Sequence, residues 1–349
     1  MNANTLHDAA VLLNANARKV SRRMLAGVEQ FVPKAQTYLS HSFDDARRAV
    51  KEIVDHGHPV VFCGGGDGTL VSTINQFKLY IDEKNRAMQG AVQDAIARYP
   101  LPKFGVLKLG TGNGIAGWVG NLKGIEPLAA LRQGFEVRTR RLRLIESESR
   151  HFHFGGLGWD AAIINDYSWF KSRMGRMPVV RKFSTGFLAY MAAIAARTVP
   201  RAFFGERPHV RVVNEGNEIF ECRLGEAARR LPYRAGDTIY EGPVSVMGAG
   251  TTPFYGYNMV AFPFADAREG FMNFRVVDIP VGEALLHSPG IFRGKYQSRG
   301  FFDFLATRVR MEFDRPTPLQ IGGDAMGLRE SLTFSLSDFS VDLLDFSPA

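Results

Sequence analysis

Nine consecutive residues, VFCGGGDGT at 61–69, constrain the fold of this chain most strongly. An apolar run, typical of a buried strand, ends there in three glycines, an acid, a fourth glycine and a hydroxyl residue. Because glycine has no Cβ, such a loop turns tightly and can direct its backbone N–H groups at an anion. The helix expected after Thr69 would point its positive end at the same loop. The pattern therefore predicts a phosphate-binding turn.

A second glycine loop, KLGTGNG at 108–114, follows the strand-like run FGVLKL. In an open α/β sheet, ligands bind at the carboxyl ends of the strands, so the two loops can face one crevice. Tight turns are the simpler alternative, but a turn needs only one or two glycines. We predict that both loops hold the phosphates of one nucleotide, through Gly64, Gly65, Gly66, Gly68, Thr69, Gly110 and Gly112.

Two charged residues in these loops call for an explanation. Asp67 cannot attract a phosphate by charge, so it indicates a divalent cation or a proton transfer, unless it only caps the loop. An ammonium at the end of a buried strand is costly unless it is paired. We therefore predict that Lys108 contacts the phosphates. Phosphoryl chemistry is the first interpretation.

The chain resembles the catalytic domain shared by diacylglycerol kinases, sphingosine kinases and their bacterial relatives. GGGDGT and LGTGNG carry most of the similarity, which spans nearly the whole chain. Further segments extend it: GWDA at 158–161, PFYG at 253–256 with the MVAFPFADAREGFMNFRVV run after it, and, more weakly, VLLNANARK and LQIGGDAMG.

The resemblance implies an α/β plus β plan with the active site between two domains. Alternating strands and helices predict a doubly wound, parallel α/β nucleotide domain over residues 1–137. Period-two alternation predicts an antiparallel β-sandwich that accepts the lipid over 138–334, with a helical insert at 184–197. Whether residues 335–349 return to the first domain is left open.

The resemblance also implies an ATP-dependent lipid kinase that uses Mg²⁺ and phosphorylates diacylglycerol or a sphingoid base. Asp67, Asp160 and Asp324 are the candidate catalytic residues. Asp160 would deprotonate or orient the acceptor hydroxyl, with Asp166 as a second candidate; the simpler alternative is an ion pair with an arginine. Asn14, Thr111 and Asn113 would contact the nucleotide, although Asn113 could merely fill a left-handed turn position.

Departures from the family pattern leave alternatives open. Gly114 replaces an aspartate, Gly322-Gly323-Asp324 replaces Asp-Gly-Glu, Ser72 replaces a helix glutamate and Lys108 replaces a proline. Lost carboxylates weaken a magnesium site, so a catalytically impaired protein that binds nucleotide or lipid is the second interpretation. A dinucleotide enzyme is the third, because residues 112–117 satisfy G-x-G-x-x-G, but no acid follows at the required spacing. A kinase of a soluble nucleotide also remains.

Charge and composition suggest the surroundings of the protein. The net charge of +8 is clustered at 138–143 and 171–211, which suits either a solvated face or an anionic membrane surface. SWFKSRMGRMPVVRKF is the best candidate membrane patch. No nucleic-acid motif supports that class of partner. With no signal peptide and no membrane-spanning run, we expect a cytoplasmic protein that is peripheral on the inner face of the membrane, of undetermined oligomeric state.

Overall fold

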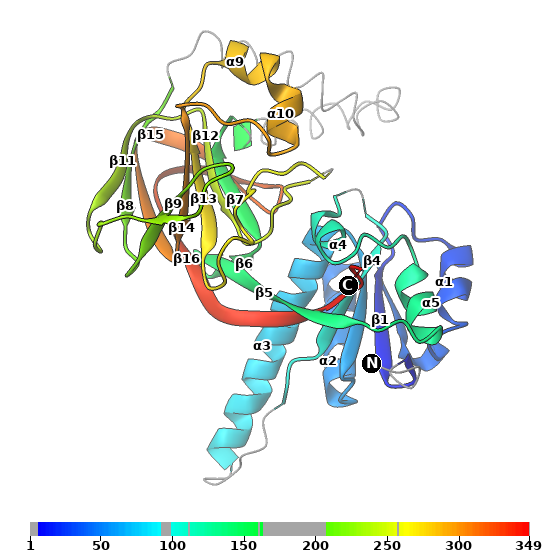
Figure 1. The fold of residues 1–349 in the computed structure, drawn as a ribbon. Coiled ribbons are helices and arrows are strands. Elements are labelled where there is room, and N and C mark those ends of the chain that lie inside the picture. Colours follow the sequence, from blue (N-terminus) through cyan, green and yellow to red (C-terminus); the bar gives the residue numbers. More distant parts are fainter. Residues whose placement is uncertain are drawn as a thin grey trace, which may run out of the picture. The chain divides into compact units, whose positions relative to one another are not determined.

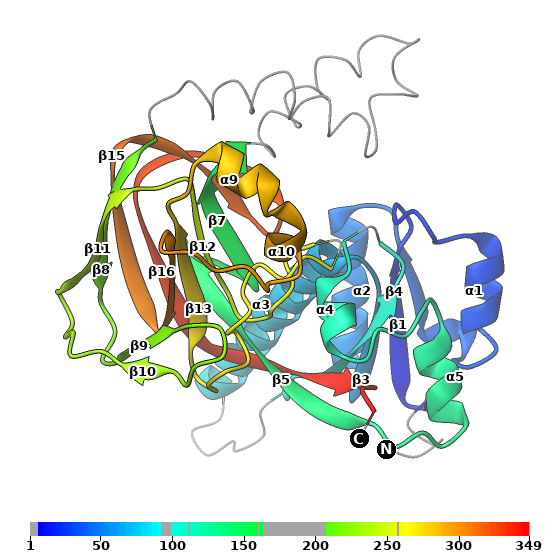
Figure 2. The ribbon, with the colours of Figure 1, turned by 45° about the horizontal axis from the view of Figure 1, so that its top comes forward.

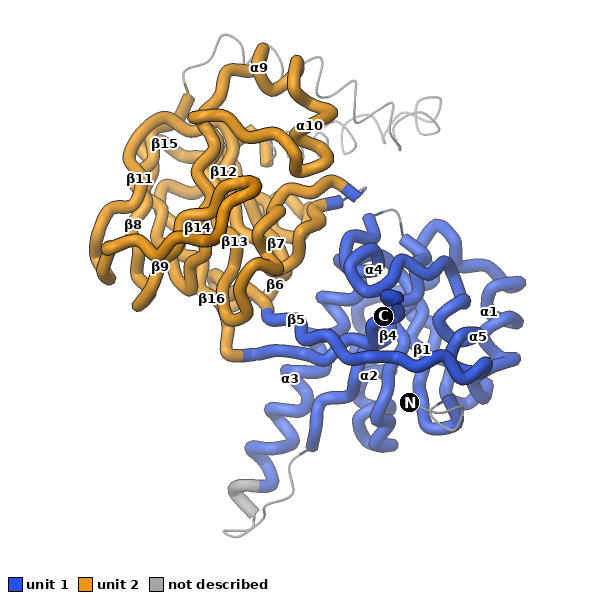
Figure 3. Tube along the Cα trace, viewed as in Figure 1, with its two compact units in different colours: residues 1–143, 256–258, 339–349 blue, residues 144–255, 259–338 orange. Residues whose placement is uncertain are grey.

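The computed structural model describes residues 6–91, 99–110, 112–159, 161–162, 207–256 and 258–348. The chain forms two compact units (Figure 3). Unit 1 comprises residues 1–143, 256–258 and 339–349, and unit 2 comprises residues 144–255 and 259–338. The strand β5 (Arg138–Ser147) runs from unit 1 into unit 2, and β16 (Asp324–Asp345) runs back (Figure 1).

Unit 1 contains a parallel sheet in the order β2-β1-β3-β4. Its strands are β1 (Ala9–Asn14), β2 (Thr37–Ser40), β3 (Val60–Gly65) and β4 (Lys103–Lys108). The carboxyl end of β16 extends the sheet, where Leu343 lies opposite Phe104. The strands β1 and β3 are buried almost throughout, as expected for a parallel sheet that is covered on both faces.

Helices cover both faces of this sheet (Figure 2). On one face, α1 (Arg22–Val28) and α5 (Glu126–Arg132) share a core with Val11, Phe62 and Leu107. On the other face lie α2 (Phe43–Asp55) and α3 (Asp67–Ala91), and Phe77 of α3 packs edge-on against Phe104. The short elements η2 (Lys34–Gln36) and α4 (Gly114–Trp118) complete the unit. The predicted doubly wound α/β domain is therefore confirmed.

Unit 2 contains two runs of antiparallel strands that are joined where β7 pairs with β15. Both runs contribute to one core, in which Phe274 and Phe334 are fully buried. The predicted plan of an α/β domain followed by an antiparallel β domain is confirmed. The first run is β10 (Arg229–Arg230), β9 (Ile219–Cys222), β14 (Phe301–Ala306), β13 (Met272–Val277), β12 (Val246–Gly250) and β7 (Phe154–Gly158). The second is β11 (Thr238–Pro243), β8 (His209–Asn214), β15 (Arg308–Ile321) and β16.

Other parts of unit 2 depart from the sequence pattern. Residues 258–264, which the sequence pattern marks as strand-like, form turns, apart from a single bridge between Phe254 and Val260. The backbone N–H of Phe262 bonds back to Pro253, so the segment folds on itself. A pair of short helices, α9 (Val281–Leu286) and α10 (Ser288–Phe292), follows β13, and β6 (Arg150–Phe152) pairs with β5. The helical insert predicted at 184–197 lies outside the described residues. Within the described residues, no helix is long and apolar enough to cross a membrane.

Candidate functional site

The two glycine loops lie together at the carboxyl edge of the unit 1 sheet. They follow β3 and β4, which are neighbours in register, with Gly65 opposite Lys108. The carbonyl oxygen of Gly65 accepts hydrogen bonds from the backbone N–H groups of Leu109 and Gly110, at 3.1 and 2.7 Å. Asp67 N–H donates to the carbonyl oxygen of Gly112 at 3.2 Å. Two segments that are far apart in sequence therefore form one backbone assembly.

The glycines of these loops fall into two groups. In the first group the backbones touch: a Cβ on Gly110 would lie 2.4 Å from Gly66 Cα, and one on Gly66 would lie 2.8 Å from the Gly112 oxygen. Gly64 and Gly65 are similarly crowded by the side chains of Leu13 and Thr69. In the second group, Gly68 and Gly112 have no atom within 4 Å of an added Cβ. Packing explains the first group, whereas the second borders open space.

Asp67 joins the two loops. Its Oδ2 accepts the N–H of Gly114 at 2.6 Å, and its Oδ1 accepts the N–H of Ile115 at 3.1 Å. Both donors belong to the first turn of α4, so the carboxylate caps a helix from a distant part of the chain. Burial raises the pKa of Asp67 to about 6, although the two N–H donors act in the opposite direction. Both carboxylate oxygens are thus engaged within the protein.

The amino terminus of α3 presents unused backbone donors beside these loops. The first N–H groups of a helix have no partner inside it. Here Asp67 N–H is taken by Gly112 and Leu70 N–H by Gly66, but the N–H groups of Gly68 and Thr69 have no acceptor among the described residues. Asn14, at the end of β1, donates from Nδ2 to Thr69 Oγ1 at 3.0 Å and so fixes this turn. A helix of 25 residues adds a favourable dipole for an anion at this end.

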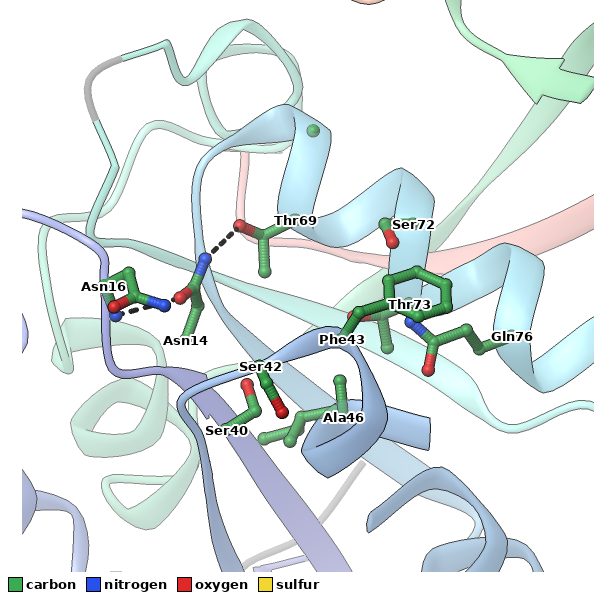
Figure 4. Close-up of a pocket in the computed structure, with 12 residues that line it drawn as sticks. Asn14, Asn16, Ser40, Ser42, Phe43, Ala46, Thr69, Ser72, Thr73 and Gln76 are labelled. Carbon is green, nitrogen blue, oxygen red and sulfur yellow. Dashed lines mark hydrogen bonds between the residues drawn. The ribbon is translucent and has the colours of Figure 1, made fainter. Parts of the chain in front are cut away.

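A polar cavity of about 290 Å³ opens beside the first turns of α3 (Figure 4). The ring of Phe43, 65% exposed, lies at its wall. The amide of Gln76 is 6% exposed, and its Oε1 has no hydrogen-bond partner among the described residues. The lining comes from β1, β2, α2 and α3: Leu12, Asn14, Asn16, Ser40, Ser42, Phe43, Ala46, Gly68, Thr69, Ser72, Thr73 and Gln76.

The other predicted residues of unit 1 have partners of their own. Asn113 Nδ2 donates to the carbonyl oxygen of Gly110 at 2.8 Å, while its buried Oδ1 has no partner among the described residues. Its φ of −145° shows that it does not fill a left-handed position. Lys108 Nζ donates to Asn121 Oδ1. This contact uses one of the three N–H donors of the ammonium group.

Three further predicted residues lie in unit 2 or outside the described residues. Asp324 is exposed at the start of β16 in unit 2, beside a turn in which Gly322 and Gly323 have positive φ. Thr111 and Asp160 lie outside the described residues, as does Asp166. In the described ranges, no cluster of three or more His, Cys, Asp or Glu residues could hold a metal ion. Asp67 therefore belongs to no such metal-binding cluster among the described residues.

The arginines at 138–143 contact the C-terminal segment and α4. Arg138 donates to the carbonyl oxygens of Ser347 and Pro348, and Arg141 lies 3.5 Å from the Asp342 carboxylate. The guanidinium of Arg140 stacks 4.0 Å from the ring centroid of Trp118. These contacts give three of the basic residues a structural role in unit 1. The predicted membrane patch at 168–183 lies outside the described residues.

Sequence patterns had not indicated most of the cavity wall. Ser40, Phe43 and Gln76 carry no motif, and they meet only because β2, α2 and α3 pack around the end of β1. One usable signal was present in the sequence. Ser42 and Asp45 form a capping box, with each side chain bonded to the backbone N–H of the other, and this spacing marks the start of a helix directly after a strand. A cavity at that strand end could have been inferred from it.

An α/β domain followed by an antiparallel β domain, with glycine loops at the carboxyl edge of the parallel sheet, defines the architectural class of this protein. Residues 8–147 match the family model of the diacylglycerol kinase catalytic domain. This part of the chain is therefore similar to that catalytic domain, and the resemblance seen in the sequence is confirmed. A search of curated proteins gave no match.

Solved structures from Bacillus anthracis strain Sterne share the fold over nearly the whole chain. One is described as a diacylglycerol kinase, with 13% identity, a TM-score of 0.55 and 95% coverage of both chains. Two are provisionally described as diacylglycerol kinases. The first has 14% identity, a TM-score of 0.58 and coverage of 97% of this chain and 96% of the other. The second has 16% identity, a TM-score of 0.60 and 95% coverage of both. At these identities the likeness concerns the fold.

Proposed function

We propose that this protein is an ATP-dependent lipid kinase that transfers the γ-phosphoryl group of ATP to the hydroxyl of a lipid such as diacylglycerol or a sphingoid base. The observation that carries the proposal is the placement of the free N–H groups of Gly68 and Thr69 beside a polar cavity. Backbone donors at a helix amino terminus are well suited to phosphate. The match of the domain to the diacylglycerol kinase family supports a lipid as the acceptor.

The cavity supplies separate environments for the parts of a nucleotide. The phosphates would bind at Gly68 and Thr69, where open space adjoins the helix terminus. The base would stack on the exposed ring of Phe43, because aromatic faces attract one another when they are offset. Gln76 lies two turns along α3 from Gly68, at the same cavity wall (Figure 4). The amide would offer the base hydrogen bonds.

Catalysis in this proposal rests on positioning and electrostatic stabilisation, as in phosphoryl transfer generally. Asn14 and Asp67 hold the two glycine loops in place through their hydrogen bonds. Asp160 is proposed to orient the acceptor hydroxyl. Asp324, which belongs to unit 2, is proposed as a further catalytic carboxylate. Magnesium enters only as the ion that accompanies ATP, since the described residues provide no metal cluster.

A non-catalytic protein that binds nucleotide or lipid is the second candidate. It is favoured by the engagement of both Asp67 oxygens with Gly114 and Ile115, which leaves this carboxylate little freedom to act in chemistry. Transfer of labelled phosphate from ATP to a mixed lipid extract separates the two candidates. Labelled lipid supports the kinase, whereas nucleotide binding without labelled lipid supports the second candidate.

The variant Gly68→Val tests the site itself. The added side chain would enter open space beside the helix terminus, so the fold is expected to remain while affinity for ATP falls at least tenfold. Gly282→Val is the matched control, because it too is a helical glycine with no atom within 4 Å of an added Cβ. Unchanged ATP affinity in Gly68→Val, measured by calorimetric titration, would exclude the proposed phosphate site.

A further inference from the structure

The helix pair α9–α10 of unit 2 exposes large apolar side chains. Leu285 is 57% exposed, Leu286 is 76% exposed and Phe292 is 45% exposed, all within eight consecutive residues. Single exposed leucines are ordinary on protein surfaces, but a local group of this kind marks a surface that is covered in use. The group therefore needs a partner.

The pair is firmly anchored, so this exposure is built into the fold. Val281 is buried, and Ala284 and Ile291 pack against the cluster formed by Val277, Ile279 and Phe301. The stacked rings of His287 and Tyr296, with centroids 4.2 Å apart, connect the two helices to the chain that follows. Leu285, Leu286 and Phe292 remain outside this cluster.

Gly294 fixes the end of α10. It has a φ of +65° and donates to the Ile291 carbonyl oxygen at 3.0 Å, while Lys295 N–H reaches the Gly290 carbonyl oxygen at 2.9 Å. These two bonds form a Schellman motif. The chain that carries the next basic residues is thereby held beside the helix end.

Basic side chains adjoin the apolar group. Arg293, Lys295 and Arg299 are exposed, and their side chains make no ion pair or hydrogen bond with any described residue. Many other arginines of unit 2, including Arg207, Arg275 and Arg329, are paired with carboxylates. Glu283 is the one acid between residues 281 and 300, and it accepts hydrogen bonds from Tyr296 and Ser298.

We propose that the α9–α10 surface, defined as Leu285, Leu286, Phe292, Arg293, Lys295 and Arg299, docks on an anionic lipid membrane. Exposed leucines enter the headgroup and acyl boundary, and the cations meet anionic headgroups. Three cations against one engaged carboxylate make the surface complementary to such a membrane. This inference rests on the proposed function, because a kinase that phosphorylates a lipid must reach its substrate in a membrane.

Sedimentation with vesicles, without any nucleotide, tests the inference on the full chain. We expect binding to vesicles of phosphatidylcholine with phosphatidylglycerol, weaker binding to phosphatidylcholine alone, and loss of the difference at high ionic strength. The double variant R293E/K295E should lower the partition coefficient by at least about 25-fold, since each basic residue contributes about fivefold. The double variant L285S/L286S should lower it by about tenfold or more.

Matched controls keep the outcome specific to this surface. Leu328→Ser replaces another exposed leucine of unit 2, and Arg234→Glu reverses another exposed cation of unit 2. Neither control should change the partition coefficient by more than about twofold, because neither belongs to the surface. Equal binding by the surface variants and the wild type would overturn the inference. Wild-type protein that does not bind anionic vesicles would also overturn it.

A second copy of the chain is the competing occupant. If light scattering shows a dimer that L285S/L286S dissociates, with vesicle binding unchanged, the membrane inference is overturned. A kinase assay separates this inference from the proposed function. The surface variants should phosphorylate lipid in detergent micelles like the wild type but lose activity on vesicles. Vesicle binding that depends on the α9–α10 surface, with no kinase activity in micelles or on vesicles, would refute the proposed function alone.

Discussion

Asp67→Asn is the perturbation that examines most closely how the two glycine loops are held. In the wild type, a nearly buried carboxylate accepts the N–H groups of Gly114 and Ile115. The asparagine keeps the shape but has only one acceptor oxygen, and it cannot ionise. The two proteins should therefore respond differently to pH.

The magnitude follows from the raised pKa. Burial raises the pKa of Asp67 from 3.8 to about 6 in the folded protein. A group whose folded pKa is raised contributes stability that is fully present below the unfolded pKa and is lost as the pH rises through the folded pKa. The loss amounts to about 3 kcal/mol, at about 1.4 kcal/mol for each pKa unit. The asparagine variant does not undergo this loss.

The expected result is a change in the stability difference between the two proteins. Relative to the wild type, Asp67→Asn should gain about 3 kcal/mol of unfolding free energy between pH 3.5 and pH 7. Urea unfolding at several pH values measures it, followed by the fluorescence of Trp118, which lies in the α4 helix that Asp67 caps. The other two of the three tryptophans are replaced by phenylalanine in both proteins.

Parallel pH profiles would refute the description of Asp67 as a buried carboxylate with a raised pKa. An opposite slope would mean that the two N–H donors outweigh burial. Asp67→Ala provides a second measurement, because it leaves the N–H groups of Gly114 and Ile115 without an acceptor, at about 1–3 kcal/mol each. A loss of kinase activity with unchanged stability in this variant would show that Asp67 acts in chemistry rather than in holding the loops.

Two further predictions concern unit 2. The ring of His153 is 1% exposed, both of its nitrogens lack partners among the described residues, and burial lowers its pKa to about 3. The free energy of unfolding should therefore decrease as the pH falls below about 6.5, the pKa of an unfolded histidine, by about 2 kcal/mol at pH 5. His153→Phe should remove that decrease in acid unfolding curves. Asp303, 1% exposed, receives both Nε and Nη2 of Arg275 at 2.8 and 2.9 Å. Asp303 also accepts Asn273 Nδ2 at 3.0 Å. Asp303→Leu should cost about 3–5 kcal/mol in thermal or urea unfolding, and adding Arg275→Met should recover most of the loss, because the unpaired guanidinium carries most of the cost; a double variant as unstable as the single one would contradict this.

The framework of unit 1 could be predicted from the sequence because local signals agree with the tertiary structure there. The runs at 9–13 and 60–63 are apolar throughout, and such runs are typical of strands inside a sheet covered on both faces. The glycines 64–66 were visible as a loop. Their function as close packing points between two backbones was not visible, because that contact depends on Gly110.

The site was less predictable because its polar groups find partners from distant segments. Lys108 donates to Asn121, an amide that no motif marks in the sequence. Asp67 accepts hydrogen bonds from the first turn of α4, a contact with a distant segment that its place in a glycine loop does not reveal. Phe43 and Gln76 reach the cavity through helix packing that no local pattern encodes.

Unit 2 shows where period-two alternation fails. The segment 257–264 alternates like a strand, but Pro263 cannot donate a ladder hydrogen bond, and its neighbours form turns instead. The exposure of the leucines of α9–α10 could not be predicted from the sequence either, since a short helix of mixed composition does not indicate which side chains remain outside the core.

A crystal structure with a non-hydrolysable ATP analogue tests the central claim most directly. The phosphates should lie at the N–H groups of Gly68 and Thr69, and the base should lie against Phe43. An analogue bound elsewhere, or saturating analogue that leaves this cavity empty, would contradict it.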